Sequence, residues 1–156
     1  MRNEDLLKPT LSVFSKAPAL YHPTGLALAA FFGGPLGASI YAFANSARLN
    51  RLAQDAPVIL ALCAAAFLLP LELARLDGLR PLVDFLGVSA PRAIELLLRA
   101  LGLLCFGAIY LMHRRFFRSA RIASVKPLPG WVPGISAVIA GYLANLAFTA
   151  WILKHH

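Results

Sequence analysis

Charged residues and cysteines are scarce in this chain of 156 residues. Only 14% of the residues are charged, whereas a soluble domain usually carries about 25%. The two cysteines, Cys63 and Cys105, lie in apolar stretches without a CxxC pattern or a His/Cys cluster. A disulfide framework and a zinc site are therefore excluded as interpretations. A glycine-rich phosphate loop is also missing from the sequence, so nucleotide chemistry of that kind is not indicated.

Apolar residues are abundant instead, at 59% of the chain. They gather in four stretches, at about 23–44, 56–73, 94–112 and 131–153. Each is close to the ~20 residues that a helix needs to cross a bilayer. The sequence therefore predicts an all-α integral membrane protein, a four-helix bundle with short loops. Residues 1–22 are predicted to be an extramembrane tail, and residues 23–156 a single transmembrane domain.

Aromatic residues and a short amphipathic pattern mark the expected membrane surfaces. Trp131 and Trp151 frame the last stretch, and ~20 residues of helix measure ~30 Å, close to the thickness of the hydrocarbon core. Tyr21 precedes the first stretch, so these three side chains are predicted interfacial anchors. In the loop 75–91, leucine and valine recur at helical spacing in positions 79, 82, 83 and 86. This pattern predicts a short helix that lies in the interface.

Small residues in the first and last stretches predict close helix packing. Glycines and alanines at intervals of four allow a neighbouring backbone to approach closely, and a proline inside the first stretch predicts a kink. A polar amide in the last stretch needs a partner across a helix interface. The predicted packing residues are Gly33, Gly34, Pro35, Gly37, Ala38, Gly141 and Asn145. A broken helix that lines a binding site, as in transporters, is the alternative.

Four charged residues lie close enough to the membrane interior to be functional candidates: Glu72, Arg75, Glu95 and Arg99. A hairpin of the second and third stretches would bring all four to the same end. They are predicted to form a polar membrane cluster of two neutralising pairs. A proton or ion pathway, and a site for a lipid head group or a partner's charge, remain open.

The net charge of +8 is explained by basic residues at a lipid surface rather than by nucleic-acid binding. The densest basic segment follows the third stretch and contains Arg114, Arg115, Arg118, Arg121 and Lys126. We expect this segment to face the cytoplasm and to contact anionic lipid. With four crossings, both termini are then expected on the extracytoplasmic side.

One motif resembles a set of small bacterial inner-membrane proteins. The chain reads LYHP at residues 20–23 and FFGGPLGA at 31–38, with Asn45 and Leu49 further on. Members of that set have an LYSP start, an FxGGPLA helix and an Asn-aromatic-x-x-Leu exit. This chain lacks the aromatic residue of the exit. The resemblance covers about 30 residues and implies a location in the bacterial inner membrane, but no activity.

Catalysis is not indicated by these residues, and no catalytic residue, cofactor or metal ligand is predicted. Ser39, Ser136 and Thr149 have no histidine base at a similar depth, and the predicted crossings place His22 and His113 at opposite surfaces, too far apart for one haem. The leading hypothesis is a non-enzymatic protein that acts by contact with another membrane protein or with itself, as an accessory subunit or an immunity-type protein. The alternative is a small oligomeric transporter or pore that uses the Glu/Arg cluster.

Overall fold

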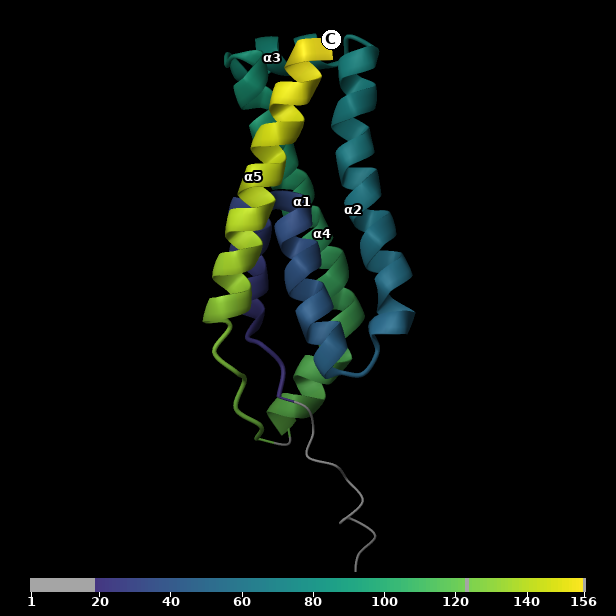
Figure 1. Cartoon of the computed structure of the whole chain (residues 1–156), viewed down its shortest axis with the longest axis vertical. Coiled ribbons are helices and arrows are strands. Elements are labelled where there is room, and N and C mark those ends of the chain that lie inside the picture. Colours follow the sequence, from purple (N-terminus) through teal and green to yellow (C-terminus); the bar gives the residue numbers. More distant parts are fainter. Residues whose placement is uncertain (1–18, 123, 156) are drawn as a thin grey trace, which may run out of the picture.

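The computed structural model describes residues 19–122 and 124–155. This part of the chain forms five helices, α1 (Pro23–Arg48), α2 (Leu52–Arg75), α3 (Leu79–Leu86), α4 (Ala90–Ile122) and α5 (Trp131–His155). All except α3 are long and apolar enough to cross a membrane, and Figure 1 shows them as one elongated bundle. The predicted all-α bundle with four long apolar helices is confirmed. Most of the predicted tail, residues 1–18, lies outside the described residues.

Helix α1 doubles back on itself at Gly34. This residue has φ 61° and ψ −152°, a backbone conformation that favours glycine, and Pro35 follows it. The residues before the break form a first arm, 23–33, and those after it form a second arm, 35–48. The two arms run antiparallel, because the Tyr41 hydroxyl donates to the His22 carbonyl at 2.9 Å. Figure 1 shows the purple first arm beside the blue second arm.

Both ends of α1 therefore lie at one end of the bundle. Just before α1, the Tyr21 amide donates to Asn45 Oδ1 at 2.9 Å, and the Leu128 amide donates to the Leu20 carbonyl at 2.9 Å. Residues 19–22 thus lie beside the α4–α5 connection, whereas α5 ends at the opposite end (Figure 1). Four complete crossings would bring the start of α1 and the end of α5 to the same end of the bundle, whereas in the described residues they lie at opposite ends. On which side of the membrane each terminus lies stays a prediction.

The tip of the α1 hairpin packs against α4 and α5 through glycines. A Cβ atom at Gly33 would lie 2.8 Å from the Ala137 carbonyl oxygen. At Gly141 and Gly102 the nearest atoms to an added Cβ would be backbone atoms of the α1 hairpin, Gly33 and Ala30 respectively. The helices can approach this closely only because these positions have no side chain.

Helix α2 is the most peripheral of the long helices. Its buried residues are Asp55, Ile59, Ala66 and Pro70. Above the hairpin tip, Phe67 of α2 meets Phe148 of α5 edge to face, with ring centroids 4.9 Å apart. These rings pack on a small second core of Ile94, Leu98 and Ile152.

Helix α3 joins α2 to α4 at the end of the bundle where α5 terminates (Figure 1). The predicted helix at 79–86 is confirmed. None of its residues is buried, and Gly87 closes it with φ 62°, as is usual after a helix. Its position in a membrane interface stays a prediction.

Candidate functional site

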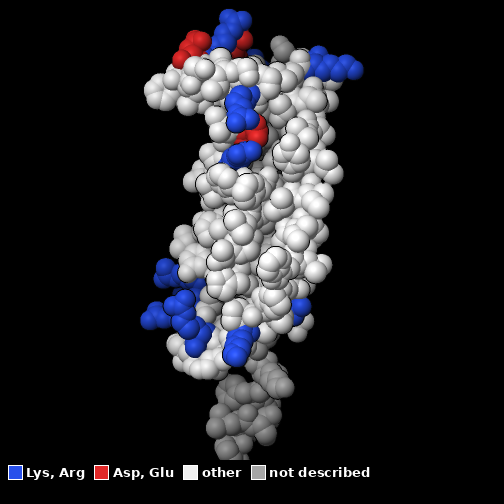
Figure 2. All heavy atoms as spheres, turned by 90° about the vertical axis from the view of Figure 1, so that its left-hand side faces the viewer, with Lys and Arg blue, Asp and Glu red and all other residues white. Residues whose placement is uncertain are grey.

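A charged notch opens between α4, α5 and the tip of the α1 hairpin. Its volume is about 270 Å³. Its polar lining consists of Ser89, Arg92, Glu95, Arg99, Tyr142, Asn145 and Thr149, and its apolar lining of Phe32, Pro91 and Leu146. Figure 2 shows a broad stretch without Lys, Arg, Asp or Glu on the face drawn, between charged groups near the two ends.

The charges in the notch do not balance. Glu95 pairs with Arg99 one turn further along α4, and its other carboxylate oxygen lies 3.3 Å from Arg92 Nη1. One carboxylate thus serves two guanidinium groups, which leaves one excess positive charge. Arg99 also lies over the ring of Phe31, 5.6 Å from its centroid, so the first arm of α1 supports its position.

Asn145 connects the notch to the hairpin tip. Its side chain lies against Gly34, since a Cβ there would be 3.2 Å from Asn145 Oδ1. The residue is only 8% exposed, and Oδ1 has no hydrogen-bond partner among the described residues. A buried acceptor of this kind usually has a partner, and Asn145 lies where the notch meets the hairpin tip.

The residues of the predicted polar membrane cluster form two separate pairs. Arg75 lies 3.2 Å from Glu72 on α2, and both side chains are more than half exposed. The pair of Glu95 and Arg99 is on α4, about one-third exposed. Among residues 19–122 and 124–155, no hydrogen bond or ion pair joins the two pairs. Only the α4 pair belongs to the notch.

The predicted packing residues gather around the notch and the hairpin tip. Gly33 and Gly37 face Ala137 of α5, and Gly141 faces Gly33. Ala38 is fully buried in the second arm. Gly33, Gly34, Gly37, Gly141 and Asn145 thus lie at the junction between α1 and α5, and Pro35 is buried within α1.

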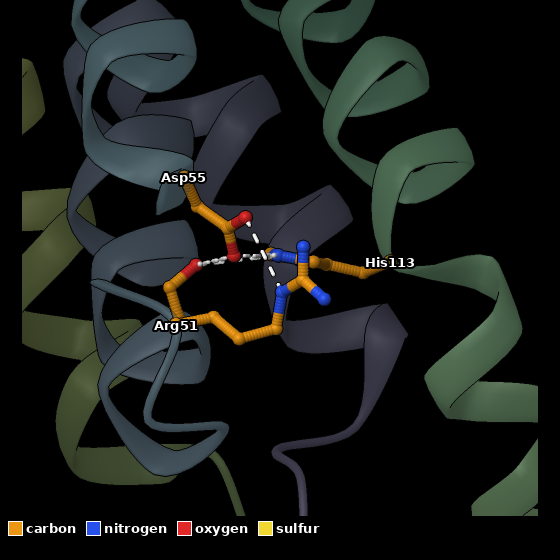
Figure 3. Close-up of polar contacts among 4 residues, drawn as sticks. Arg51, Asp55 and His113 are labelled. Carbon is orange, nitrogen blue, oxygen red and sulfur yellow. Dashed lines mark hydrogen bonds and ion pairs between the residues drawn. The ribbon is translucent and has the colours of Figure 1, made fainter. Parts of the chain in front are cut away.

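A buried polar cluster that the sequence patterns did not predict lies at the other end of the bundle. Asp55 Oδ2 accepts from the Ser46 hydroxyl at 2.9 Å and from His113 Nε2 at 3.1 Å. Arg51 Nε lies 3.7 Å from Asp55 Oδ1, as Figure 3 shows. The cluster links the end of α1, the start of α2 and α4. One signal could have found it, because Asp55 stands in the first turn of an apolar helix.

This cluster differs from a Ser–His–Asp catalytic triad. In a triad the serine and the carboxylate contact different ring nitrogens of the histidine. Here Ser46 Oγ and Asp55 Oδ2 both lie near Nε2, at 3.2 Å and 3.1 Å. Nδ1 of His113 has no partner among the described residues, and His113 is 1% exposed. The geometry fits a cluster that holds three helices together rather than a nucleophile open to substrate.

The end of the bundle near this cluster carries the predicted basic surface, and we call it the basic end. It contains Arg114, Arg115, Arg118, Arg121 and Lys126, and also Arg48 and Arg51 from the α1–α2 connection. Arg48 donates to the Tyr21 hydroxyl at 2.8 Å, and Arg51 lies over the Phe116 ring. Figure 2 shows Lys and Arg atoms at this end without acidic atoms among them on the face drawn.

The predicted interfacial anchors occupy both ends. Tyr21 and Trp131 lie at the basic end, and Trp151 lies in the last turns of α5 at the opposite end.

The placement of His22 and His113 also differs from the prediction. Because α1 doubles back, both lie at the basic end rather than at opposite surfaces. His22 Nδ1 accepts from the Thr24 amide and His113 contacts Asp55, so each ring is engaged separately. Within the described ranges, no group of three or more His, Cys, Asp or Glu residues could hold a metal ion.

Comparison of the chain with protein-family models, with curated proteins and with solved structures finds no match.

Proposed function

We propose that this multi-pass membrane protein is a non-enzymatic protein of the bacterial inner membrane that acts by binding another membrane protein. The charged notch carries this proposal. Charged groups on a lateral apolar face are costly in lipid, because acyl chains offer no hydrogen bond or counter-charge. A partner helix can supply both.

The chemistry of the notch suggests what the partner contributes. One excess guanidinium charge, from Arg92 and Arg99 against Glu95, is complemented by a carboxylate. We therefore expect a partner helix that carries an Asp or Glu at the depth of the notch.

The exposed side of α2 offers a second contact surface to the same kind of partner. Small residues on this side, Ala61, Ala64 and Ala65, are exposed at helical spacing. Such a side permits close approach of another helix. An accessory subunit or an immunity-type protein would use surfaces of this kind.

We further propose that the basic end faces the cytoplasm. Seven cations lie there, on the segments 48–51 and 114–126, with Asp55 as the only acid in or beside them. The opposite end carries five cations, at positions 75, 80, 92, 99 and 154, against four acids. An excess of Lys and Arg marks cytoplasmic segments. The C-terminal end of α5 would then be extracytoplasmic.

Site-specific photo-crosslinking in native membranes tests the partner hypothesis. A photoreactive residue replaces Leu146 in the notch, and in a control it replaces the exposed Leu104 of α4. We expect one discrete adduct from position 146, which Arg99→Gln reduces at least tenfold. Arg75→Gln, which breaks the exposed pair outside the notch, should leave the adduct unchanged. A protein that gives no adduct and purifies as an isolated monomer would contradict the proposal.

A transporter for a small anion is the second candidate, and the interrupted α1 helix favours it. Broken helices beside a polar cavity hold substrates in several transporters, and the notch adjoins Gly34 with an excess positive charge. Chloride efflux from proteoliposomes is the measurement. Efflux that Arg99→Gln abolishes and Arg75→Gln preserves would support transport, whereas the absence of efflux above empty liposomes would exclude chloride as a substrate.

A further inference from the structure

An apolar groove runs between the first arm of α1 and the start of α5. Its volume is about 440 Å³. Its walls are largely apolar and include Leu28, Phe32, Ile135, Val138 and Ile139. Gly134 lines the same groove, and a Cβ there would have only an ordinary contact with Tyr41, so the start of α5 leaves open space at this position. The groove is a surface feature that acyl chains can reach from the side.

A second, basic pocket adjoins the mouth of the groove. Its volume is about 300 Å³, and its charged lining residues are Arg121 and Lys126. Ser124 adds a hydroxyl, and none of the described residues that line this pocket is acidic. His22 lines both the groove and the basic pocket, so the two spaces meet at the N-terminal end of α1.

We propose that the groove and the basic pocket together bind one anionic phospholipid. Arg121 and Lys126 hold the phosphate of the head group, and one acyl chain lies in the groove. Charge complementarity selects an anionic head group, because two cations face it without an acid. This site lies at the basic end, and it shares one lining residue, Phe32, with the charged notch.

The dimensions of the groove match one leaflet. Trp131 stands at its mouth and Ile139 lies deepest along α5, and eight residues of helix span about 12 Å. Half of a hydrocarbon core measures about 15 Å. An acyl chain that starts at the head-group level beside Trp131 therefore ends near Phe32, close to the tip of the α1 hairpin.

Native mass spectrometry of the full-length protein in detergent tests the head-group contact. Phosphatidylglycerol is titrated, with phosphatidylcholine as the neutral comparison. We expect phosphatidylglycerol to bind more tightly, and the double substitution Arg121→Gln and Lys126→Gln to weaken it about fivefold for each cation. The matched control Arg114→Gln and Arg115→Gln removes the same charge outside the pocket lining and should retain the wild-type affinity. Equal losses in the two double variants would overturn the proposal.

Filling the groove tests the acyl-chain contact. Gly134→Leu places a side chain in the groove, and its Cβ has only an ordinary contact, 3.8 Å from Tyr41 Cε2. Gly107→Leu on α4 is the control, because its Cβ meets nothing within 4 Å. We expect Gly134→Leu to reduce phosphatidylglycerol binding at least fivefold and Gly107→Leu to leave it unchanged.

A second blocking variant, Ile135→Trp, repeats this test should Gly134→Leu lower the thermal stability in detergent. Unchanged lipid binding in both blocking variants would overturn the groove as the acyl-chain site. Loss of a dimer peak instead of a lipid peak would identify a second copy as the occupant and would also overturn the proposal.

Discussion

Single glycines set the distance between helices in this bundle. Gly141 of α5 faces the backbone of Gly33, and Gly102 of α4 faces Ala30 and Gly34. Gly34 itself needs its positive φ to turn the chain at the tip. Because lipid is as apolar as the side chains, packing of this kind is a main source of stability between membrane helices.

The substitution Gly141→Ala should destabilise the protein by about 1–3 kcal/mol, the usual cost of overpacking. The added methyl group would meet the Gly33 carbonyl, which is backbone and cannot rotate away. Thermal unfolding in detergent is the measurement. Gly107→Ala is the matched control, because its Cβ lies in open space, and helix propensity favours alanine there by up to ~1 kcal/mol. Equal melting temperatures of the two variants would contradict this account.

Asp55 is the residue on which the buried cluster at the basic end depends. Asp55→Ala leaves Ser46 and His113 buried without their shared acceptor. We expect a loss of about 2–6 kcal/mol of unfolding free energy, because each buried donor that loses its acceptor costs about 1–3 kcal/mol. Asp77→Asn is the comparison: Asp77 pairs with Arg80, and both side chains are at least 78% exposed. Its effect should stay below about 1 kcal/mol.

A double substitution distinguishes a coupled cluster from separate contacts. In the combined variant Asp55→Ala and His113→Leu, the imidazole is absent as well, so no buried ring nitrogen is left without the Asp55 carboxylate as its partner. The combined loss should therefore be smaller than the sum of the two single losses. Strict additivity in denaturation experiments would show that Asp55 and His113 act independently.

Helix α1 shows most clearly what sequence patterns can and cannot predict. The composition predicted a helical apolar segment at 23–44, and the Gly33–Gly34–Pro35 motif predicted an interruption. Hydropathy, however, measures the length of an apolar run and not its direction. A hairpin of two short helices and a single helix that crosses the membrane can have the same apolar composition. The reversal at Gly34 was therefore predicted only as a kink.

The polar sites were predicted unevenly for a related reason. Glu95 and Arg99 are four residues apart on one helix, so their pairing follows from helix geometry alone. Ser46, Asp55 and His113 come from three different helices, and their contact depends on how these helices pack side by side. Spacing along the sequence carries no information on such a contact.

Helix α2 follows its predicted position and length closely, from Leu52 to Arg75. Its apolar run is uninterrupted by charge between Asp55 and Glu72, so the pattern was unambiguous. The few buried positions on α2 were not predictable, because in a membrane helix the positions that face lipid and those that face protein are both occupied by apolar residues.

At the scale of the whole molecule, the hairpin leads us to expect three complete crossings of the membrane rather than four. The second, fourth and fifth helices run from end to end, whereas the arms of α1 begin and end at the basic end (Figure 1). The first arm has eleven residues, or about 16 Å of helix, which reaches about the middle of a ~30 Å core.

Cysteine labelling tests this topology. In a background with Cys63→Ala and Cys105→Ala, single cysteines are placed at His22, Asn50 and Asp77. An impermeant maleimide should label His22→Cys and Asn50→Cys from the same compartment, and Asp77→Cys from the opposite one. A complete crossing by α1 would group position 22 with position 77 instead. Inverted vesicles provide the reciprocal measurement.

The re-entrant hairpin also gives the molecule unequal widths in the two leaflets. Five helical segments fill the leaflet of the basic end, the two arms of α1 with α2, α4 and α5, whereas three fill the other leaflet. A tapered inclusion of this kind displaces more lipid from one monolayer than from the other. The bilayer around it is expected to bend toward the narrower side, and the protein to concentrate where the wider monolayer is already stretched.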